Sequence, residues 1–405
     1  MSSVKDLSFL IIAPEAYPPV TGESIVTTKF ILGLLSHEIQ LDVIHNPGSA
    51  QYYPAEVGMS FNSHNLRLIN PFDNHPLLKR SAGVYKSLLW CILAAKTGYN
   101  IIRQKKPSLL ISRAMPVYGH LPALILSYLS GIPWLANWSD PIPLSISPFP
   151  FRKKCRLIDF TKVYCNLVIR RANLHSFPNT FLSTYFKTYY KKLGSKSIIV
   201  PHIAHTDYYQ NPITNKDHLR MCHVGGLGLR NPSSLLSALK TYLVKKPEHK
   251  IELIFIGNID KEALGAVESL DLKENVSFIP AVPYEESLKQ IQSCDVAILI
   301  EANTEVGIFL PSKVMDMIQL GKPILSISPI NGVMEELLKG NHGGIAVDLN
   351  DINQIYNAIS ELYDSWAEGI LLEKYSSIGH REKFNENYVI TGLIKELKER
   401  IDSFK

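Results

Sequence analysis

Short apolar runs alternate with helical stretches along this chain, and the whole alternation occurs twice. In the first half, apolar runs cover residues 7–13, 39–45 and 108–112, and a helical periodicity spans about 24–36. Continuous hydrophobic strands separated by helices are typical of a parallel sheet that is covered on both faces. The same pattern begins again after residue 215. We therefore expect two α/β domains, each with a doubly wound sheet.

The second series has one clear helical stretch, at about 232–244, among its apolar runs. These runs are residues 220–224, 251–257, 275–279, 295–300 and 322–327. A polar, proline-containing segment at 209–217 separates the two series, which predicts domains over 1–210 and 211–385. The last helical stretch, about 387–403, belongs to neither series. We expect residues 386–405 to return to the first domain.

The composition favours a folded cytoplasmic protein. Hydrophobic residues make up 46% of the chain and charged residues 20%, as in ordinary globular domains. The five cysteines form no C-x-x-C pair, which favours a reducing compartment. No signal peptide is recognisable, and the longest apolar patches fall short of the roughly 20 residues that span a bilayer. A net charge of +5 permits an anionic ligand or membrane surface without requiring nucleic acid, and we expect no nucleic acid partner.

Two glycine-containing turns between a predicted strand and a predicted helix are candidate anion sites. The first, residues 18–24, contains Gly22, where the backbone can approach a ligand closely and a helix begins. A simple helix cap explains this turn equally well. The second contains Gly225, Gly226 and Arg230, whose guanidinium suits a phosphate. Its alternative is an ordinary solvated arginine.

A third turn, within residues 305–328, is the most specific. Its candidate ligand-binding residues are Gly307, Pro311, Ser312, Lys313 and Asp316. Free amides at the start of the helix can hold a diphosphate, to which Lys313 adds charge, and Asp316 can accept hydrogen bonds from ribose hydroxyls. The alternative is that Asp316 only complements the helix dipole.

This third turn resembles the signature of retaining glycosyltransferase family 4, in which a glycine loop, a proline, a helix with an acidic residue and G-K-P follow in that order. Asp316 stands five positions before Gly321, like the second acid of that family's two-glutamate motif. Residues 18–23, 131–141, 223–232 and 343–351 resemble other family segments, so the likeness covers nearly the whole chain. It implies the GT-B architecture, two Rossmann-like domains facing across a cleft.

Three positions depart from the family pattern. Gly226 replaces the first basic residue of the glycine turn, and Glu23 replaces the second glycine of P-P-x-x-G-G. Ile308 stands where the first glutamate is expected, and Glu305 lies three residues too early. These departures leave the fold prediction unchanged and affect the residues that contact the sugar.

Three residues are candidates for catalysis: Asp140, His120 and Glu305. Asp140 follows the predicted strand 134–137, where the resemblance places a substrate-facing residue. His120 begins a helical stretch after 108–112, although a lone histidine there is often structural. Asp295 is expected to bond backbone amides. No D-x-D pair is present, so we predict no metal site and expect the helix dipole, Arg230 and Lys313 to replace a metal.

The resemblance implies a retaining hexosyltransferase without a bound cofactor. Its donor is a UDP- or GDP-linked sugar, and its acceptor is a saccharide or a lipid-linked saccharide in surface polysaccharide biosynthesis. The P-S-K form of residues 311–313 resembles the branch that builds O-antigen and capsule. Three alternatives remain: a glycogen-synthase-like enzyme, a nucleotide-sugar epimerase on the same fold, and a catalytically inactive GT-B subunit that only binds.

Residues 77–103 predict an amphipathic helix or helix pair. Its apolar face contains Tyr85, Leu88, Leu89, Trp90 and Ile92, and its cations are Lys79, Lys86, Lys96 and Arg103. A second basic cluster occupies residues 151–156. We expect docking on an anionic membrane, at the inner face of the plasma membrane. The alternative is that the apolar face packs on the domain core.

Overall fold

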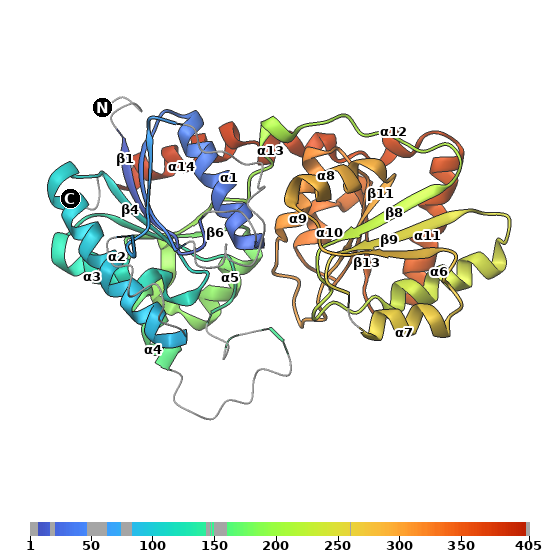
Figure 1. The fold of residues 1–405 in the computed structure, drawn as a ribbon, viewed down its shortest axis with the longest axis horizontal. Coiled ribbons are helices and arrows are strands. Elements are labelled where there is room, and N and C mark those ends of the chain that lie inside the picture. Colours follow the sequence, from blue (N-terminus) through green and yellow to red (C-terminus); the bar gives the residue numbers. More distant parts are fainter. Residues whose placement is uncertain are drawn as a thin grey trace. The chain divides into compact units, whose positions relative to one another are not determined.

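The chain folds into two compact units in a computed structural model (Figure 1). The structure describes residues 7–16, 21–46, 63–73, 83–142, 146, 148–149, 160–259 and 261–401. The first unit combines Met1–Ile203 with Asn385–Lys405, and the second is Ala204–Phe384. The division falls between Ile203 and Ala204, and the last helix lies in the first unit. We call these units the first and second domains.

The first domain contains a parallel sheet of seven strands within the described residues, in the order β3-β2-β1-β4-β5-β6-β7. The strands are β1 (Ser8–Ile12), β2 (Gln40–Ile44), β3 (Leu66–Ile69), β4 (Leu109–Arg113), β5 (Trp134–Asn137), β6 (Leu174–Phe177) and β7 (Ser197–Ile199). The helices are α1 (Gly22–Ser36), α2 (Gly83–Lys105), α3 (His120–Ser130), α4 (Phe160–Arg171), α5 (Thr180–Tyr189) and α14 (Glu386–Ile401), with short 3-10 turns η4 (Val117–Gly119) and η7 (Lys191–Lys196).

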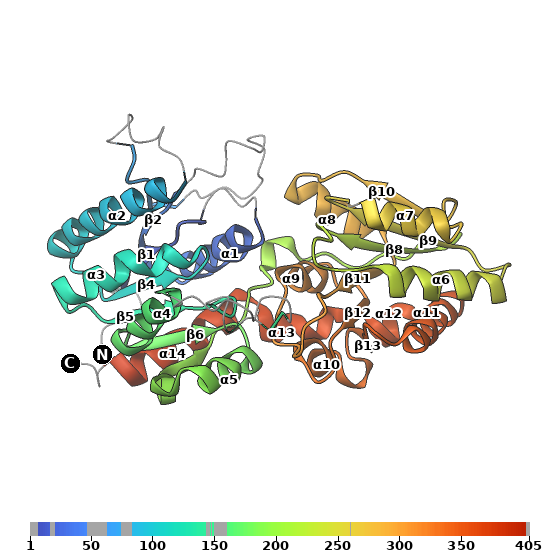
Figure 2. The same ribbon diagram turned by 90° about the horizontal axis from the view of Figure 1, so that it is seen from below.

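Helices cover both faces of this sheet. Helices α2, α3 and α4 pack side by side in that order, as Figure 2 shows. Helix α14 packs on α1, and both contribute to a core that contains Phe30, Leu34, Ile390 and Leu393. The last helix of the chain is therefore part of the first domain's core.

The second domain contains a parallel sheet of six strands within the described residues, in the order β10-β9-β8-β11-β12-β13. The strands are β8 (Leu219–Val224), β9 (Ile251–Ile256), β10 (Val276–Ile279), β11 (Val296–Ile300), β12 (Ile324–Ser328) and β13 (Gly344–Asp348). The helices are α6 (Ser233–Lys245), α7 (Lys261–Ser269), α8 (Tyr284–Ser293), α9 (Ser312–Gln319), α10 (Val333–Leu337), α11 (Ile352–Ala367), α12 (Leu371–Tyr375) and α13 (Arg381–Phe384), with 3-10 turns η8 (Thr206–Tyr208), η9 (Lys339–Asn341) and η10 (Ser377–His380).

The predicted apolar runs all become strands, and the predicted helices near 24–36, 232–244 and 387–403 are α1, α6 and α14. The described part of residues 77–103 is one continuous helix, α2. Five strands of the described residues lie outside these runs: β5, which was predicted separately at 134–137, and β3, β6, β7 and β13. β3 and β7 are only four and three residues long. In β6 the fully buried His175 interrupts the apolar pattern. Among the described residues, no helix has both the length and the hydrophobicity to cross a membrane.

Candidate functional site

The glycine turn after β8 lies at the carboxyl ends of the second domain's central strands. Gly225 has φ +100°, in the left-handed region that favours glycine, and its amide donates to the Ile256 carbonyl at 2.6 Å. A Cβ atom on Gly225 would lie 2.5 Å from Nζ of Lys313. The Lys313 side chain therefore lies directly against this turn, and the structure brings together two sequence-predicted site residues from separate motifs.

Lys313 and Arg230 form a cationic pair at this turn. Lys313 is half-buried, and burial lowers its pKa to about 8, with a further lowering by the positive charge of Arg230. Glu301 at the end of β11 and Asp316 partly offset these effects. Both cations belong to one turn, since Arg230 ends the segment that Gly225 begins and Lys313 lies against Gly225. An anion bound here would relieve both the repulsion and the loss of hydration.

Gly226 leaves room where the resembled family has a basic residue. A Cβ atom there would make an ordinary 3.5 Å contact with Cβ of Asn258, and its φ is not in the left-handed region. Gly226 has no side chain to offer a charge, but Lys313 of α9 reaches the same turn. That Lys313 supplies the charge missing at Gly226 stays a prediction.

No side chain of the described residues caps the start of α9. Its N-cap is Pro311, which has no side-chain acceptor to offer the amides of Ser312 and its neighbours. The preceding loop is fixed at Gly307, where a Cβ atom would lie 2.8 Å from Cα of Gly332, and the Val333 amide donates to the Gly307 carbonyl at 2.8 Å. The Val314 amide donates to the Pro311 carbonyl at 3.1 Å, and the helix dipole together with the amides of Ser312 and Lys313 favours an anion here.

Asp316 lies one turn further along α9 and is buried. Its Oδ1 accepts a 2.5 Å hydrogen bond from the Tyr284 hydroxyl and a 3.5 Å bond from the Gln319 amide. Burial and the Asp316 charge hold the pKa of Tyr284 well above its usual range, so the phenol stays a donor. This network fixes the carboxylate in place. The assignment of Asp316 to a ribose stays a prediction.

His223, which we did not single out from the sequence, lies beneath the glycine turn. It is fully buried in β8, and its Nδ1 pairs with the Ile298 carbonyl at 3.1 Å. Its Nε2 has no hydrogen-bond partner in the described part of the chain. Burial, together with the charge of Lys313, holds its pKa well below the usual value. A polar residue inside the apolar run 220–224 was the signal that could have identified it.

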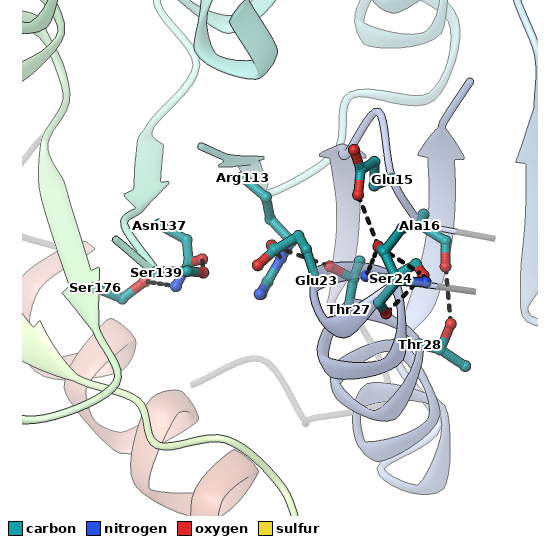
Figure 3. Close-up of polar contacts among 11 residues, drawn as sticks. Glu15, Ala16, Glu23, Ser24, Thr27, Thr28, Arg113, Asn137, Ser139 and Ser176 are labelled. Carbon is teal, nitrogen blue, oxygen red and sulfur yellow. Dashed lines mark hydrogen bonds and ion pairs between the residues drawn. The ribbon is translucent and has the colours of Figure 1, made fainter. Parts of the chain in front are cut away.

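The corresponding turn of the first domain is closed by its own side chains (Figure 3). Thr21 caps α1, accepting from the Ser24 amide at 3.1 Å, and the Thr21 amide donates to Ser24 Oγ at 2.7 Å. Gly22 is exposed at the first position of this helix. The helix-cap interpretation of residues 18–24 is confirmed at Thr21, and residues 17–20 lie outside the described residues.

Glu23 and Arg113 form a buried ion pair beside this cap. Arg113 Nε donates to Glu23 Oε1 at 3.0 Å, and the two side chains are 4% and 11% exposed. Thr27 also donates to Glu23 Oε1, at 3.3 Å. Glu23, which departs from the family pattern, therefore has a specific partner at the end of β4. An arginine that closes the apolar run 108–112 was the available sequence signal for it.

His120, a candidate catalytic residue, is a fully buried core residue. Its Nδ1 pairs with Ser112 Oγ at 2.7 Å, and its ring packs on Trp138 with centroids 4.5 Å apart. Burial lowers its pKa to about 3, with smaller contributions from His175 and Arg113, so it is neutral at pH 7. Since no surface of His120 is exposed, we give it no direct role in the function proposed below.

The other two catalytic candidates lie on strand-end loops in different domains. Asp140 follows β5 and is half-buried, and Glu305 is exposed in the loop between β11 and α9. Their catalytic roles stay predictions. Asp295 accepts from the backbone amides of Asn215 and Arg220 at 2.6 and 2.7 Å, which confirms its predicted structural role.

No three histidine, cysteine, aspartate or glutamate side chains of the described residues gather closely enough to hold a metal ion. The predicted independence from metal is not decided by this observation. It stays a prediction, which rests on the cations and helix start described above.

Comparison with known proteins adds a family match to this geometry. Residues 209–386 match the family model of glycosyl transferases group 1. This match covers the second domain, including both glycine turns and α9. A search of curated proteins finds no match to the chain.

Solved structures match both domains together. Sucrose-phosphate synthase from Thermosynechococcus elongatus matches with a TM-score of 0.69 at 13% identity, covering 98% of this chain and 100% of that chain. HepE of Anabaena, in complex with UDP, matches with a TM-score of 0.65 at 12% identity, covering 97% and 99%. WaaG, a glycosyltransferase involved in lipopolysaccharide biosynthesis, matches with a TM-score of 0.61 at 11% identity, covering 96% and 98%.

The chain has the GT-B fold. Two parallel sheets of seven and six strands within the described residues, each flanked by helices, match these structures over almost their full length. The expected pair of Rossmann-like domains is thereby confirmed. The low identities limit this conclusion to the fold, and function has to be argued from the site.

Proposed function

We propose that this protein is a nucleotide-sugar-dependent glycosyltransferase whose second domain holds the diphosphate of the donor. The observation that carries the proposal is the contact of Lys313 with the Gly225 turn, at the open start of α9 and beside Arg230. Two cations and a helix start without a side-chain cap at one point suit a diphosphate better than any neutral ligand. The family match over residues 209–386 supports the same reaction class.

The donor is proposed to be a UDP- or GDP-linked hexose, transferred with retention to a saccharide or lipid-linked acceptor in surface polysaccharide biosynthesis. HepE is known in complex with UDP and UDP-glucose, WaaB is a lipopolysaccharide outer core galactosyltransferase, and WaaG is a glycosyltransferase involved in lipopolysaccharide biosynthesis. As the glycosidic bond breaks, negative charge grows on the diphosphate, and Lys313 and Arg230 stabilise it.

Release of nucleoside diphosphate from a panel of nucleotide sugars tests this proposal. A transferase releases UDP or GDP from at least one donor, slowly to water and faster when a saccharide acceptor is added. An inactive binding subunit releases none. An epimerase interconverts two nucleotide sugars with no dependence on an acceptor. Either of these two results would reject the proposal.

We further propose that transfer proceeds without a divalent metal, because the two cations and the α9 dipole replace it. Turnover should be unchanged when EDTA is added to the active enzyme. A loss of turnover that magnesium or manganese restores would reject metal independence alone, and would leave the assignment of the diphosphate site in place.

Docking on an anionic membrane at the cytoplasmic face is the proposed means of reaching a lipid-linked acceptor. On α2, Tyr85, Leu88 and Ile92 are 82%, 50% and 61% exposed, at helical spacing i, i+3, i+7. On α4, the exposed residues Phe160, Val163 and Leu167 repeat that spacing. Both helices begin at the carboxyl ends of the strands, as crossover helices of a parallel sheet do. The two apolar stripes therefore lie at one end of the domain.

The prediction that Trp90 belongs to the membrane face is wrong. Trp90 is fully buried, and its Nε1 donates to the His45 carbonyl at 3.2 Å, so it is part of the core. The other predicted residues remain on this face: Tyr85, Leu88 and Ile92 are exposed, and Leu89 is half-buried. Lys96 and Arg103 are exposed and Lys86 is half-buried. Lys79 and residues 151–156 lie outside the described residues.

Co-sedimentation with phosphatidylglycerol–phosphatidylcholine vesicles at low salt tests the docking proposal. Each cation near the surface contributes about 1 kcal/mol, so the wild type should pellet and high salt should release it. Ile92→Ser combined with Lys96→Glu should leave the protein in the supernatant. Leu129→Ser is the matched control, because Leu129 is 61% exposed but lies at the far end of α3. A wild type that stays soluble would reject docking.

A further inference from the structure

His223 lies at the switch point of the second domain's sheet. The strand order β10-β9-β8-β11-β12-β13 reverses direction between β8 and β11, and open α/β sheets bind their ligands at such a crevice. Backbone pairing of these two strands extends to Cys222 and Ala297. One residue further along, His223 is fully buried and its imidazole contacts the Ile298 carbonyl of β11. The ring therefore bridges the two strands where their backbone pairing ends.

The contact with Ile298 decides which imidazole nitrogen carries the hydrogen. Nδ1 lies 3.1 Å from the Ile298 carbonyl oxygen, which can only accept, so Nδ1 is the donor. Burial, followed by the charge of Lys313, holds the pKa of His223 well below its usual value, and the ring is neutral at pH 7. Nε2 therefore offers a lone pair, and no group of the described chain donates to it. A buried acceptor without a donor is unfavourable.

Lys313 has the opposite deficit, a donor without an acceptor. Its ammonium carries three N–H groups, and none of them has a hydrogen-bond partner among the described residues. A Cβ atom on Gly225, which is two residues after His223, would lie 2.5 Å from Nζ of Lys313. After burial, the charge of Lys313 lowers the pKa of His223 most. An unpaired donor and an unpaired acceptor therefore lie at the same turn.

The charged groups around Lys313 do not fix the direction of its ammonium. Arg230, on the turn after β8, repels it, and Glu301 at the end of β11 and Asp316 in α9 attract it. A charge attracts from any direction, whereas a hydrogen bond requires alignment of donor and acceptor. An imidazole anchored in the core of the sheet can give the ammonium one position.

We propose that His223 is a positioning residue of the diphosphate site, whose Nε2 accepts a hydrogen bond from the Lys313 ammonium and holds it at the Gly225 turn. The flexible four-carbon stem of lysine brings the ammonium to Nε2 by rotation about its own bonds. The other two N–H groups then remain for phosphate oxygens. This inference rests on the proposed function, and it adds a core residue to the diphosphate site.

The proposed bond changes the pKa of Lys313. A neutral acceptor that bonds to the protonated amine favours the charged form and raises the pKa of the lysine. Removal of the acceptor should therefore lower that pKa. In His223→Phe the pKa of Lys313 should lie about one unit below its value in the wild type. In His223→Gln it should stay close to the wild-type value, because the amide oxygen of glutamine is also an acceptor.

NMR titration of the full chain, with lysine labelled at Cε with ¹³C, measures this pKa without any nucleotide. The signal that is absent from Lys313→Arg identifies the residue. His120→Phe is the matched control, because His120 is also fully buried, with Nδ1 bonded to Ser112 and Nε2 without a partner in the described chain. His120 lies in the first domain, so its replacement should leave the pKa of Lys313 unchanged.

A second readout leaves His223 in place, and it decides the question if His223→Phe fails to fold. The Nε2 signal of His223, observed with ¹⁵N-labelled histidine, should shift in Lys313→Ala because the donor is lost. Arg230→Ala removes a nearby charge but no donor to Nε2, so the shift should be much smaller.

Calorimetric titration of the same variants with UDP and GDP connects the inference to the proposed function. At pH 8, His223→Phe should bind the nucleotide about fivefold more weakly than the wild type, and His223→Gln should bind nearly as well.

Two results would overturn the positioning role: a Lys313 pKa that is the same in His223→Phe and the wild type, or an equal lowering in His120→Phe. If nucleotide sugars are turned over in either case, the proposed function stands and only this inference fails. If the pKa falls as expected but no nucleotide binds, His223 does position Lys313 and the proposed function fails.

Discussion

The two domains share one topology but differ in chemistry at the carboxyl ends of their strands. In the first domain, Thr21 and Ser24 cap α1, and Glu23 neutralises Arg113. In the second domain, α9 starts at an uncapped proline, and Lys313 reaches the Gly225 turn next to Arg230. The same backbone plan thus carries a capped helix with a neutralised arginine in one domain and a cationic turn in the other. Side chains, and not the fold, decide which ligand each sheet can receive.

Replacing Lys313 by alanine should have the largest effect on nucleotide affinity, because it removes a cation that only the second domain's turn has. A charge-assisted hydrogen bond contributes about 1.5–3 kcal/mol, so UDP or GDP affinity should fall roughly 10- to 150-fold by calorimetry. Arg230→Ala should give a smaller loss because Arg230 lies on the more exposed turn. Lys246→Ala, an exposed lysine at the far end of α6, should change nothing. Equal nucleotide affinity in all variants would show that Lys313 and Arg230 do not bind the diphosphate.

Acid should destabilise the first domain through His120 and His175. Burial lowers the pKa of each to about 3, against about 6.5 when unfolded. Because the folded pKa is lowered, the stabilisation is complete above pH 6.5 and is lost as pH falls from there toward 3. At pH 5 each histidine should remove about 2 kcal/mol from the free energy of unfolding.

Urea unfolding at pH 7 and pH 5 measures this loss. In His175→Asn the difference between the two pH values should shrink, whatever the variant's stability at pH 7. His37→Asn is a control, because His37 is a half-buried residue at the end of α1, away from His120 and His175, and the pH difference should persist in this variant. A pH difference that is the same in His175→Asn and the wild type would show that these histidines titrate normally in the folded protein.

Nucleotide affinity should weaken as pH rises through the Lys313 pKa of about 8. Burial and the Arg230 charge lower this pKa. The lysine therefore loses its proton, and with it the attraction for the diphosphate, at a pH where binding can still be measured. Between pH 7 and pH 9 the dissociation constant should rise about tenfold. Lys313→Arg should bind with little pH dependence over that range, because arginine stays protonated. The same pH dependence in both proteins would assign the titration to another group.

The smallest effect is expected at Gly226, where the structure has room for a side chain. Gly226→Arg adds a cation where the resembled family has one, with only an ordinary contact at Asn258. We expect a few-fold gain in nucleotide affinity in the wild-type background, and a partial rescue of Lys313→Ala. Rescue requires that both cations serve one ligand. No gain in either background would mean that Gly226 does not face the diphosphate.

The sequence predicted the alternation of strands and helices well, because continuous apolar runs such as β1 and β11 are buried on both faces. It also located Gly225, Arg230 and Lys313 on strand-end turns. It could not pair Glu23 with Arg113, which lie 90 positions apart and meet only through the sheet. It could not show that Trp90 and His120 point into the core, because a helix that begins at a functional edge carries polar and apolar residues on every side.

Hydrogen–deuterium exchange of the full chain, with and without UDP or GDP, tests whether the second domain holds the diphosphate. If the second domain's edge is the diphosphate site, amides in residues 224–230 and 307–316 should become protected, and those in 21–30 and 109–115 should not. Protection should be lost in Lys313→Ala. Protection confined to the first domain, or absent from both glycine turns at saturating nucleotide, would contradict the account.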